Sequence, residues 1–384
     1  MMGDNGQLPE ILTRSPVRTV YGAGSLAELG KLAHAQGARR VLLVTDPGLE
    51  AAGHPLKAQE SLEAAGVDVH VFDGVQENPT TRHVRAGVAF AREVNPDWLV
   101  AVGGGSSMDC AKGINLVLTN GGEIADYWGI DKPTEPMLPF IAVPTTAGTG
   151  SEAQSFALIT DEHTHQKMAC GDSRLPQDGG LRPHLAILDP KLTRTQPPTV
   201  AAAAGIDAVA HAVETAATTK RNKISRSFSM EAWRLLDAAF ETAMRDPDND
   251  EARSGMLLGA HLAGAAIENS MLGAAHACAN PLTAKFGIVH GVAVGIMLPH
   301  VVRYNASSAD NPYADIEASA DRLAERIESF LDAGDHPRSL AAVDVPAESL
   351  PALAESAAKQ WTATFNPVPV GAAELLDIYR RALE

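Results

Sequence analysis

The chain contains 384 residues, of which 45% are hydrophobic and 20% are charged, a composition typical of globular proteins and unlike that of disordered or fibrous ones. Its 31 basic and 47 acidic side chains give a formal net charge of −16, which would repel a phosphate backbone and argues against a nucleic-acid partner. The chain is longer than most domains that are built around a single hydrophobic core, so two domains are expected.

The three cysteines, Cys110, Cys170 and Cys278, are far apart in the sequence, form no CxxC pair and are odd in number. This pattern favours a reducing compartment, and we predict a cytoplasmic protein. The N-terminal stretch MMGDNGQLPEILTR has no basic start followed by an apolar run, and no window approaches about eighteen uninterrupted apolar residues. Neither secretion nor association with a membrane is therefore expected.

The first half of the chain is predicted to alternate strands with helices. Short apolar, β-branched runs predict strands at 39–46, 67–72, 98–102, 140–143 and 185–188, and helices are expected at 48–65, 81–93 and 108–117. This alternation is typical of a parallel sheet covered by helices. The polar residues 161–167 predict a hairpin turn.

Two glycine-rich loops follow predicted strands of this sheet. The first contains Gly103, Gly104, Gly105 and Ser106 and leads into a helix, so its backbone N–H groups could cradle a phosphate at the helix N-terminus. A tight turn without a ligand explains the same residues equally well, and neither GxGxxG nor GxxxxGK[ST] is matched. The second loop, PTTAGTGSE at 144–152, follows the strand 140–143. Two such loops at one sheet edge suit a dinucleotide.

Asp46 ends the first strong strand and allows two interpretations. Its carboxylate could accept hydrogen bonds from an adenosine ribose and would repel a 2′-phosphate, which favours NAD over NADP. It could equally cap the helix that follows Pro47.

The second half of the chain is predicted to be helical. After Pro197 and Pro198 the sequence is rich in alanine and nearly free of strand-like runs, with helices expected at 201–218, 224–244, 250–268 and 318–331. Residues 246–251 and 307–312 look like polar connections. We therefore predict a domain boundary near Asp189, which gives domains at 1–189 and 190–384.

His276 and His290 lie in a small-residue, apolar segment and are fourteen residues apart, about four turns of an unbroken helix. Pro281 and Gly287 between them favour a broken path, in which two helix ends could point to one place. Taken singly, each histidine is more often a hydrogen-bonded core residue than a ligand.

Asp207 and His211 supply the other half of a possible metal site. They are four residues apart in the predicted helix 201–218, hence on one face, and their neighbours are alanine and valine. A capped or salt-bridged pair would also explain them. With His276 and His290 they make one carboxylate and three imidazoles, a set suited to Fe²⁺ or Zn²⁺ and able to satisfy four buried polar groups at once.

Three motifs together resemble those of the iron-containing (group III) alcohol dehydrogenases. They are GGGSSMDCAK at 103–112, PTTAGTGSE at 144–152, and GIDAVAHAVE at 205–214 with the segment ending IVHGVAVGIMLPH at 288–300. The resemblance extends from Tyr21 to about Asn305. It implies a Rossmann-like α/β N-terminal domain with a parallel sheet, an all-α C-terminal domain as in dehydroquinate synthase-like proteins, and an active site in the cleft between them.

The resemblance also implies an activity and a set of site residues. The expected reaction is hydride transfer between NAD(H) and a primary or small alcohol or aldehyde, with Fe²⁺ as the metal, Zn²⁺ as a second candidate, and a homodimer or higher homo-oligomer as the assembly. The implied metal ligands are Asp207, His211, His276 and His290. The implied cofactor contacts are Asp46, Asn78, Gly103, Gly104, Gly105, Ser106, Asp109, Thr145, Thr146, Thr149 and Lys167.

The sequence departs from the family pattern at Asn280, a position that is commonly histidine in members with alcohol activity. Asparagine cannot accept and pass on a proton at neutral pH, so proton release would run through the ribose and water, or the substrate contacts would differ. Maleylacetate reductase-like and dehydroquinate synthase-like proteins share the architecture, although the former lack the aspartate and three histidines. A non-catalytic metal- or nucleotide-binding protein is a third interpretation.

Overall fold

The computed structural model describes residues 15, 17–307 and 311–384. The N-terminal stretch 1–14 and part of the predicted connection 307–312 lie outside the described residues. The chain forms two compact units: the first extends to Thr146 and includes Ser151–Thr195, and the second comprises Ala147–Gly150 and Gln196–Glu384. The domain limits 1–189 and 190–384 remain a prediction.

The first unit contains a six-stranded sheet in which every pair of neighbours is parallel. Its strands, in spatial order, are β1 (Arg18–Tyr21), β9 (Leu185–Leu188), β6 (Phe140–Pro144), β4 (Trp98–Gly103), β2 (Arg40–Val44) and β3 (Asp68–Phe72). The central strand β4 is buried along its whole length, which explains its continuous apolar run. All five predicted strands are confirmed, and β1 was not predicted.

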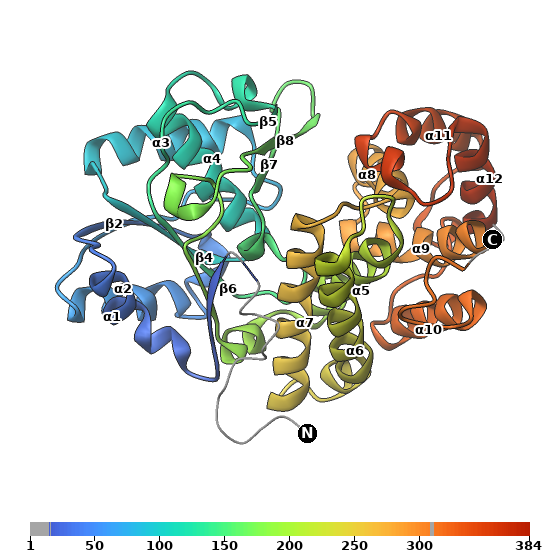
Figure 1. Cartoon of the computed structure of the whole chain (residues 1–384), viewed down its shortest axis with the longest axis horizontal. Coiled ribbons are helices and arrows are strands. Elements are labelled where there is room, and N and C mark those ends of the chain that lie inside the picture. The colour runs from blue at the N-terminus through green and yellow to red at the C-terminus, as the bar shows by residue number, and fades with distance from the viewer. Residues whose placement is uncertain (1–14, 16, 308–310) are drawn as a thin grey trace. The chain divides into compact units, whose positions relative to one another are not determined.

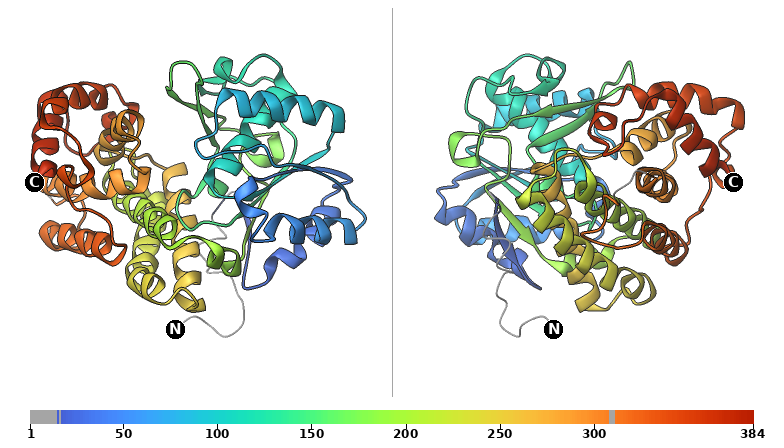
Figure 2. Two further views of the ribbon diagram at one scale, coloured as in Figure 1. Left: turned by 180° about the vertical axis from the view of Figure 1, so that it is seen from behind. Right: turned by 45° about the vertical axis from the view of Figure 1, so that its right-hand side comes forward.

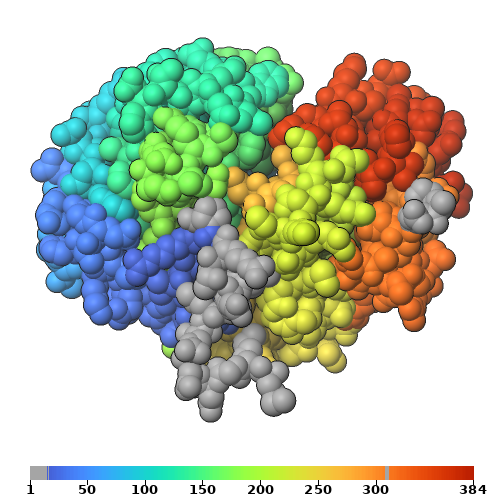
Figure 3. Space-filling model, in the orientation of Figure 1, coloured from blue at the N-terminus to red at the C-terminus, as the bar shows by residue number. Residues whose placement is uncertain are grey.

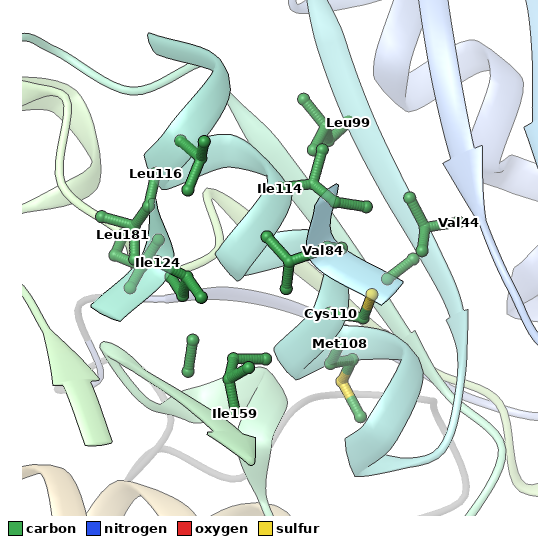
Figure 4. Packing of buried hydrophobic residues seen from close by; sticks show 14 of the residues in the cluster. Val44, Val84, Leu99, Met108, Cys110, Ile114, Leu116, Ile124, Ile159 and Leu181 are labelled. Atoms are coloured by element: carbon green, nitrogen blue, oxygen red, sulfur yellow. The ribbon is translucent and has the colours of Figure 1, made fainter. Parts of the chain in front are cut away.

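Helices cover both faces of this sheet (Figure 1). They are α1 (Leu29–Ala35), α2 (His54–Ala64), α3 (Thr81–Val94) and α4 (Gly105–Asn120). Leu43 of β2 and Val100 of β4 pack with α1 and α2, whereas their neighbours Leu42 and Leu99 pack with α3 and α4. The second of these cores is seen in Figure 4, where side chains of two helices and the sheet meet. The sheet is therefore doubly wound.

A smaller sheet of three strands adds to the first unit. It consists of β5 (Gly129–Ile130), β8 (Lys167–Gly171) and β7 (Phe156–Thr160), in that spatial order. The antiparallel pairing of β7 with β8, which sets Thr160 opposite Lys167, confirms the predicted hairpin turn at 161–167.

The second unit is helical, and none of its described residues lies in a strand (Figure 2). Its helices are α5 (Pro198–Ala217), α6 (Lys223–Arg245), α7 (Asp250–Glu268), α8 (Ala274–Phe286), α9 (His290–Ala306), α10 (Ala320–Ala333), α11 (Leu350–Ala358) and α12 (Ala372–Leu383). In the space-filling view the orange and red C-terminal segments of this unit lie next to each other (Figure 3). Helix α5 is long and apolar enough to cross a membrane, but 89% of its apolar window is buried, as in core helices of globular proteins.

The predicted break in the helical path between His276 and His290 is present, but Pro281 does not cause it. Gly287, in the left-handed conformation at φ 67°, ends α8, and α9 begins at His290. Pro281 lies inside α8, which continues past it. Both histidines therefore occupy the first turn of a helix.

The three cysteines are all buried and none forms a disulfide. Burial raises the pKa of the Cys110 and Cys170 thiols to about 12 and that of the Cys278 thiol further still. These thiols therefore stay protonated at neutral pH.

Candidate functional site

Three loops of the first unit meet at the carboxyl edge of the large sheet. Asp46 follows β2, Gly103 ends β4, and Thr145 follows β6. The three strands are neighbours in the order β6, β4, β2 and run in one direction, so their following loops lie side by side. The backbone joins two of them, since Thr145 N donates to Gly103 O at 2.9 Å. The structure thus brings together the two predicted glycine loops and Asp46.

The topology has a switch point at this edge. Strand β2 leads to α2 on one face of the sheet, whereas the adjacent β4 leads to α4 on the other face. In sheets of this class, ligands bind at the carboxyl ends of adjacent strands whose connections leave to opposite faces.

The first glycine loop is closely packed. A Cβ at Gly103 would lie 2.3 Å from Ser107 Oγ, and a Cβ at Gly104 would lie 3.3 Å from the Thr146 side chain. Helix α4 begins at Gly105 with Gly104 as its N-cap and no side-chain cap. No side chain therefore caps its first amides, and their contact with a phosphate stays a prediction.

Asp46 lies at this cradle. Its Oδ2 accepts a hydrogen bond from Ser107 Oγ at 3.1 Å. Although Asp46 precedes the short 3-10 helix Pro47–Leu49, its side chain makes no capping hydrogen bond there. The capping interpretation is therefore wrong, and the contact with ribose stays a prediction.

Two residues implied only by short motifs also lie beside the cradle. Asn78, in the left-handed conformation at φ 52°, donates its backbone N–H to Ser106 Oγ at 3.3 Å. Lys167 Nζ donates to Asn78 Oδ1 at 3.4 Å. Both side chains are exposed, so an exposed amide and an ammonium group lie next to the predicted phosphate position.

Beneath the cradle, Asp109 takes part in a buried polar network. Its Oδ1 accepts from Ser151 Oγ at 2.6 Å, and Ser151 in turn accepts from Lys112 Nζ at 2.8 Å. Burial raises the pKa of Asp109, although Lys112 and Ser151 act in the opposite direction. Sequence reasoning did not identify Lys112 or Ser151, which connect α4 to the end of the second glycine loop. Thr149 of that loop groups with the second unit.

The four predicted metal ligands come together in the second unit. Asp207 Oδ1 lies 3.3 Å from His276 Nε2, 3.5 Å from His211 Nε2 and 3.9 Å from His290 Nε2. The potential ligand atoms of Asp207, His276 and His290 all lie within 4.8 Å of one another. His211 lies beside them, with its ring stacked on that of His276 at a centroid distance of 4.9 Å.

The chemistry of this cluster fits a cation. Asp207 Oδ1 and His276 Nε2 are buried without a hydrogen-bond partner in the described part of the chain, an arrangement that costs free energy unless something satisfies them. Burial opposes ionisation of Asp207, but the three imidazoles outweigh it and lower the pKa of its carboxyl group. One carboxylate oxygen facing three imidazole nitrogens is a donor set for Fe²⁺ or Zn²⁺.

Glu214 is the site residue that sequence reasoning missed. Its Oε2 lies 2.5 Å from His276 Nδ1, and its Oε1 accepts the backbone N–H of Ala275 at 2.7 Å. Burial opposes protonation of His276, but the charge of Glu214 and the contact with Asp207 raise the pKa of His276 to about 9. The available signal was spacing, because Glu214 is seven residues after Asp207 and therefore on the same helical face.

Asn280 lies one helical turn after His276, on the same face of α8. It is half-buried, and its Nδ2 donates to Gln360 Oε1 at 3.2 Å. Gln360 immediately precedes the 3-10 helix Trp361–Phe365. Where the resemblance led us to expect histidine, the chain therefore has an amide hydrogen-bonded to a second side-chain amide.

Family models and curated relatives match nearly the whole chain. The iron-containing alcohol dehydrogenase model matches residues 16–190, and the C-terminal model of the Fe-containing alcohol dehydrogenase family matches residues 201–383. Alcohol dehydrogenase 4 of Schizosaccharomyces pombe is 36% identical over 96% of this chain and 88% of its own length. The 1,3-propanediol dehydrogenase of Klebsiella pneumoniae is 35% identical, over 94% of this chain and 96% of its own.

Solved structures agree with these matches. A 1,3-propanediol oxidoreductase is 34% identical with a TM-score of 0.90, over 96% of this chain and 98% of the other. A sulfoacetaldehyde reductase from Bifidobacterium kashiwanohense, solved in complex with NAD⁺, is 29% identical with a TM-score of 0.86, over 96% of this chain and 97% of the other. The family implies an NAD cofactor and a divalent metal. The chain belongs to the iron-containing alcohol dehydrogenase family and is an NAD-linked oxidoreductase of alcohols and aldehydes.

Proposed function

We propose that Asp207, His211, His276 and His290 hold the divalent metal of this dehydrogenase, with Fe²⁺ as the ion used and Zn²⁺ as the alternative. The observation that carries the proposal is the convergence of three imidazole nitrogens within 3.9 Å of one buried carboxylate oxygen. A metal bound there supplies a Lewis acid for the oxygen of the alcohol or aldehyde, and NAD supplies the hydride acceptor.

The chain's own residues would bind and orient the reactants. Asp207 supplies a buried negative charge, which favours a cation at this position over a neutral ligand. In the first unit, the amides at Gly104 and Gly105 and the ammonium group of Lys167 would hold the pyrophosphate of NAD. Asp46 would face the adenosine ribose and disfavour a 2′-phosphate. The remaining proposed cofactor contacts are Asn78, Gly103, Ser106, Asp109, Thr145, Thr146 and Thr149.

The substrates that we propose are small alcohols and their aldehydes. Relatives are named for 1,3-propanediol, methanol, lactaldehyde and choline, which are small molecules with a primary hydroxyl or an aldehyde group. A homodimer or higher homo-oligomer is proposed as the assembly, which size-exclusion chromatography with light scattering would measure.

The three buried, unpaired cysteines support a cytoplasmic location, which fractionation of cells with an antibody would test.

The metal proposal is tested by removing the ion and then the carboxylate. Chelator-treated protein is loaded with Fe²⁺ without oxygen, or with Zn²⁺, and NADH absorbance is followed with this panel of alcohols and aldehydes. Turnover is expected only after loading, and Asp207→Ala is expected to lose it while still binding NAD. Turnover by metal-free protein, or undiminished turnover by Asp207→Ala, would refute the site. Metal analysis of freshly purified protein distinguishes iron from zinc.

A further inference from the structure

We propose that Glu214 is a positioning residue that fixes the tautomer and orientation of His276, so that His276 Nε2 presents its lone pair to the proposed metal. This inference rests on the metal site proposed above. It assigns a role to a side chain that belongs neither to the proposed ligand set nor to the cofactor cradle.

The first argument is the hydrogen bond between the two side chains. Glu214 Oε2 lies 2.5 Å from His276 Nδ1, and both side chains are nearly completely buried. An ionised carboxylate can only accept, so the proton of this bond belongs to Nδ1. When a cation displaces the proton from Nε2, the imidazole keeps its proton on Nδ1 and has its lone pair on Nε2, the atom that lies 3.3 Å from Asp207 Oδ1. The carboxylate therefore selects the tautomer that can bind a cation.

The second argument is that Glu214 itself is held in place. Its Oε1 accepts the backbone N–H of Ala275 at 2.7 Å, so the carboxylate also caps the first turn of α8. A Cβ at Gly273 would lie 3.1 Å from this oxygen, which shows how closely the helix start approaches the carboxylate. One carboxylate thus fixes both the backbone that carries His276 and the rotation of its ring.

The third argument is the arrangement along α5. Asp207, His211 and Glu214 occupy positions i, i+4 and i+7 of one buried face. The same helix thus supplies the carboxylate beside Nε2 and the carboxylate beside Nδ1 of His276. The imidazole is held between these two acidic groups of one rigid element.

Asn366 provides a matched comparison. Its Oδ1 accepts the backbone N–H of Ala274 at 3.2 Å, the neighbour of the amide that Glu214 caps. Asn366 therefore also holds the start of α8, and its hydrogen bonds connect it to Asn305 and Val368 rather than to His276. Loss of Asn366 removes a cap of α8 and leaves the partner of the imidazole in place.

The experiment measures Co²⁺ affinity by competition with a chelator, together with the visible spectrum of bound Co²⁺ and the melting temperature of the metal-free protein. Glu214→Gln keeps an oxygen for Ala275 but turns an N–H₂ donor toward His276 Nδ1, which drives the proton to Nε2. We expect it to bind Co²⁺ about 10- to 100-fold more weakly and with an altered spectrum, the size usual for such partners of metal ligands. Glu214→Asp, which still only accepts, is expected to bind more tightly than Glu214→Gln.

Asn366→Ala is the control. It is expected to lower the melting temperature but to keep the Co²⁺ affinity within about threefold of the wild-type value, which is a change of less than 1.4 kcal/mol in binding free energy. The inference is overturned if Glu214→Gln matches a wild-type protein that binds Co²⁺, or if Asn366→Ala weakens binding as much as Glu214→Gln. A wild-type protein that binds no Co²⁺ would instead overturn the metal site, and this inference with it.

Discussion

Lys112 and Ser151 are joined by two hydrogen bonds, from Lys112 Nζ to the carbonyl oxygen of Ser151 at 2.7 Å and to its Oγ at 2.8 Å. A third bond from Nζ reaches Phe156 O at 2.9 Å. The ammonium group is buried and connects helix α4, behind the cradle, to the end of the second glycine loop.

Replacing Lys112 with methionine should therefore weaken both stability and cofactor binding. The variant keeps the apolar length of the side chain but removes the buried donor of three hydrogen bonds, which should lower the free energy of unfolding by about 3 kcal/mol. Because the loop loses its anchor, the KM for NAD should rise. Urea unfolding and NAD titration measure the two effects. Lys31→Met, at an exposed lysine, is the control, and equal behaviour of the two variants would contradict the prediction.

Gly291 marks a close approach of α9 to α5. A Cβ at this position would lie 1.9 Å from Ala203 O, so Gly291→Ala must push the start of α9, and His290 with it, away from Asp207. We expect weaker metal binding and a lower melting temperature. Ala293→Gly, in the same helix, is the control, since it should cost about 1 kcal/mol of stability through helix propensity without moving His290. Unchanged metal affinity in Gly291→Ala would show that the helix adjusts without displacing its ligand.

Asn280→His tests whether the amide sets the pH dependence of turnover. The substitution removes the hydrogen bond to Gln360 and introduces a group that titrates near its ordinary pKa of about 6.5. In the wild type no such group is available at this position. The variant is therefore expected to gain an inflection near that pH in the kcat profile for alcohol oxidation. Asn280→Ala should show no new inflection, and a profile for Asn280→His that parallels it would contradict the prediction.

His300 should make the protein less stable in mild acid. Burial, helped by Arg303 and Arg381 and opposed by Glu328, lowers the pKa of His300 to about 4. Between this value and the ordinary value of 6.5, the unfolded chain binds a proton that the folded chain does not. The free energy of unfolding therefore falls as the pH drops through this interval, by about 1 to 3 kcal/mol for this group, and is unaffected by it above the interval.

The measurement for His300 is urea unfolding at about pH 7.5 and about pH 5, on either side of the ordinary histidine pKa. His300→Gln cannot titrate, so it should lose less stability between the two conditions than the wild type. Equal losses in the two proteins would assign the acid sensitivity to other groups, among them the buried His54 and the half-buried His184, whose pKa values burial also lowers.

The sheet and most helices were predictable because their cores impose a clear pattern. Strand β4 is buried on both faces, so its sequence is a continuous apolar run. Strand β1 has only four residues, of which one is buried, so its apolar pattern was too short to detect. Helix α2 was expected from residue 48 but begins at His54, because a 3-10 helix and the left-handed Gly53 come first. Local helix propensity does not show that the α-helix begins later than the first residues that favour it.

The candidate site, too, was only partly predictable from the sequence. The spacing of Asp207 and His211 indicated a shared helical face, and the apolar, small-residue segment singled out His276 and His290. The resemblance then implied all four as ligands. Glu214 and Lys112 were missed because each acts through a partner far away in the sequence. A single sequence shows that such a residue is polar, but not which distant group it meets.

The burial of the three cysteines has a consequence for how the protein would fail under oxidative stress. Thiols that stay protonated and shielded react slowly with peroxide, because the thiolate is the reactive form. Loss of activity in air should therefore leave all three thiols titratable after denaturation. The damage is to be sought instead among the histidines around Asp207, the proposed ligands of the metal.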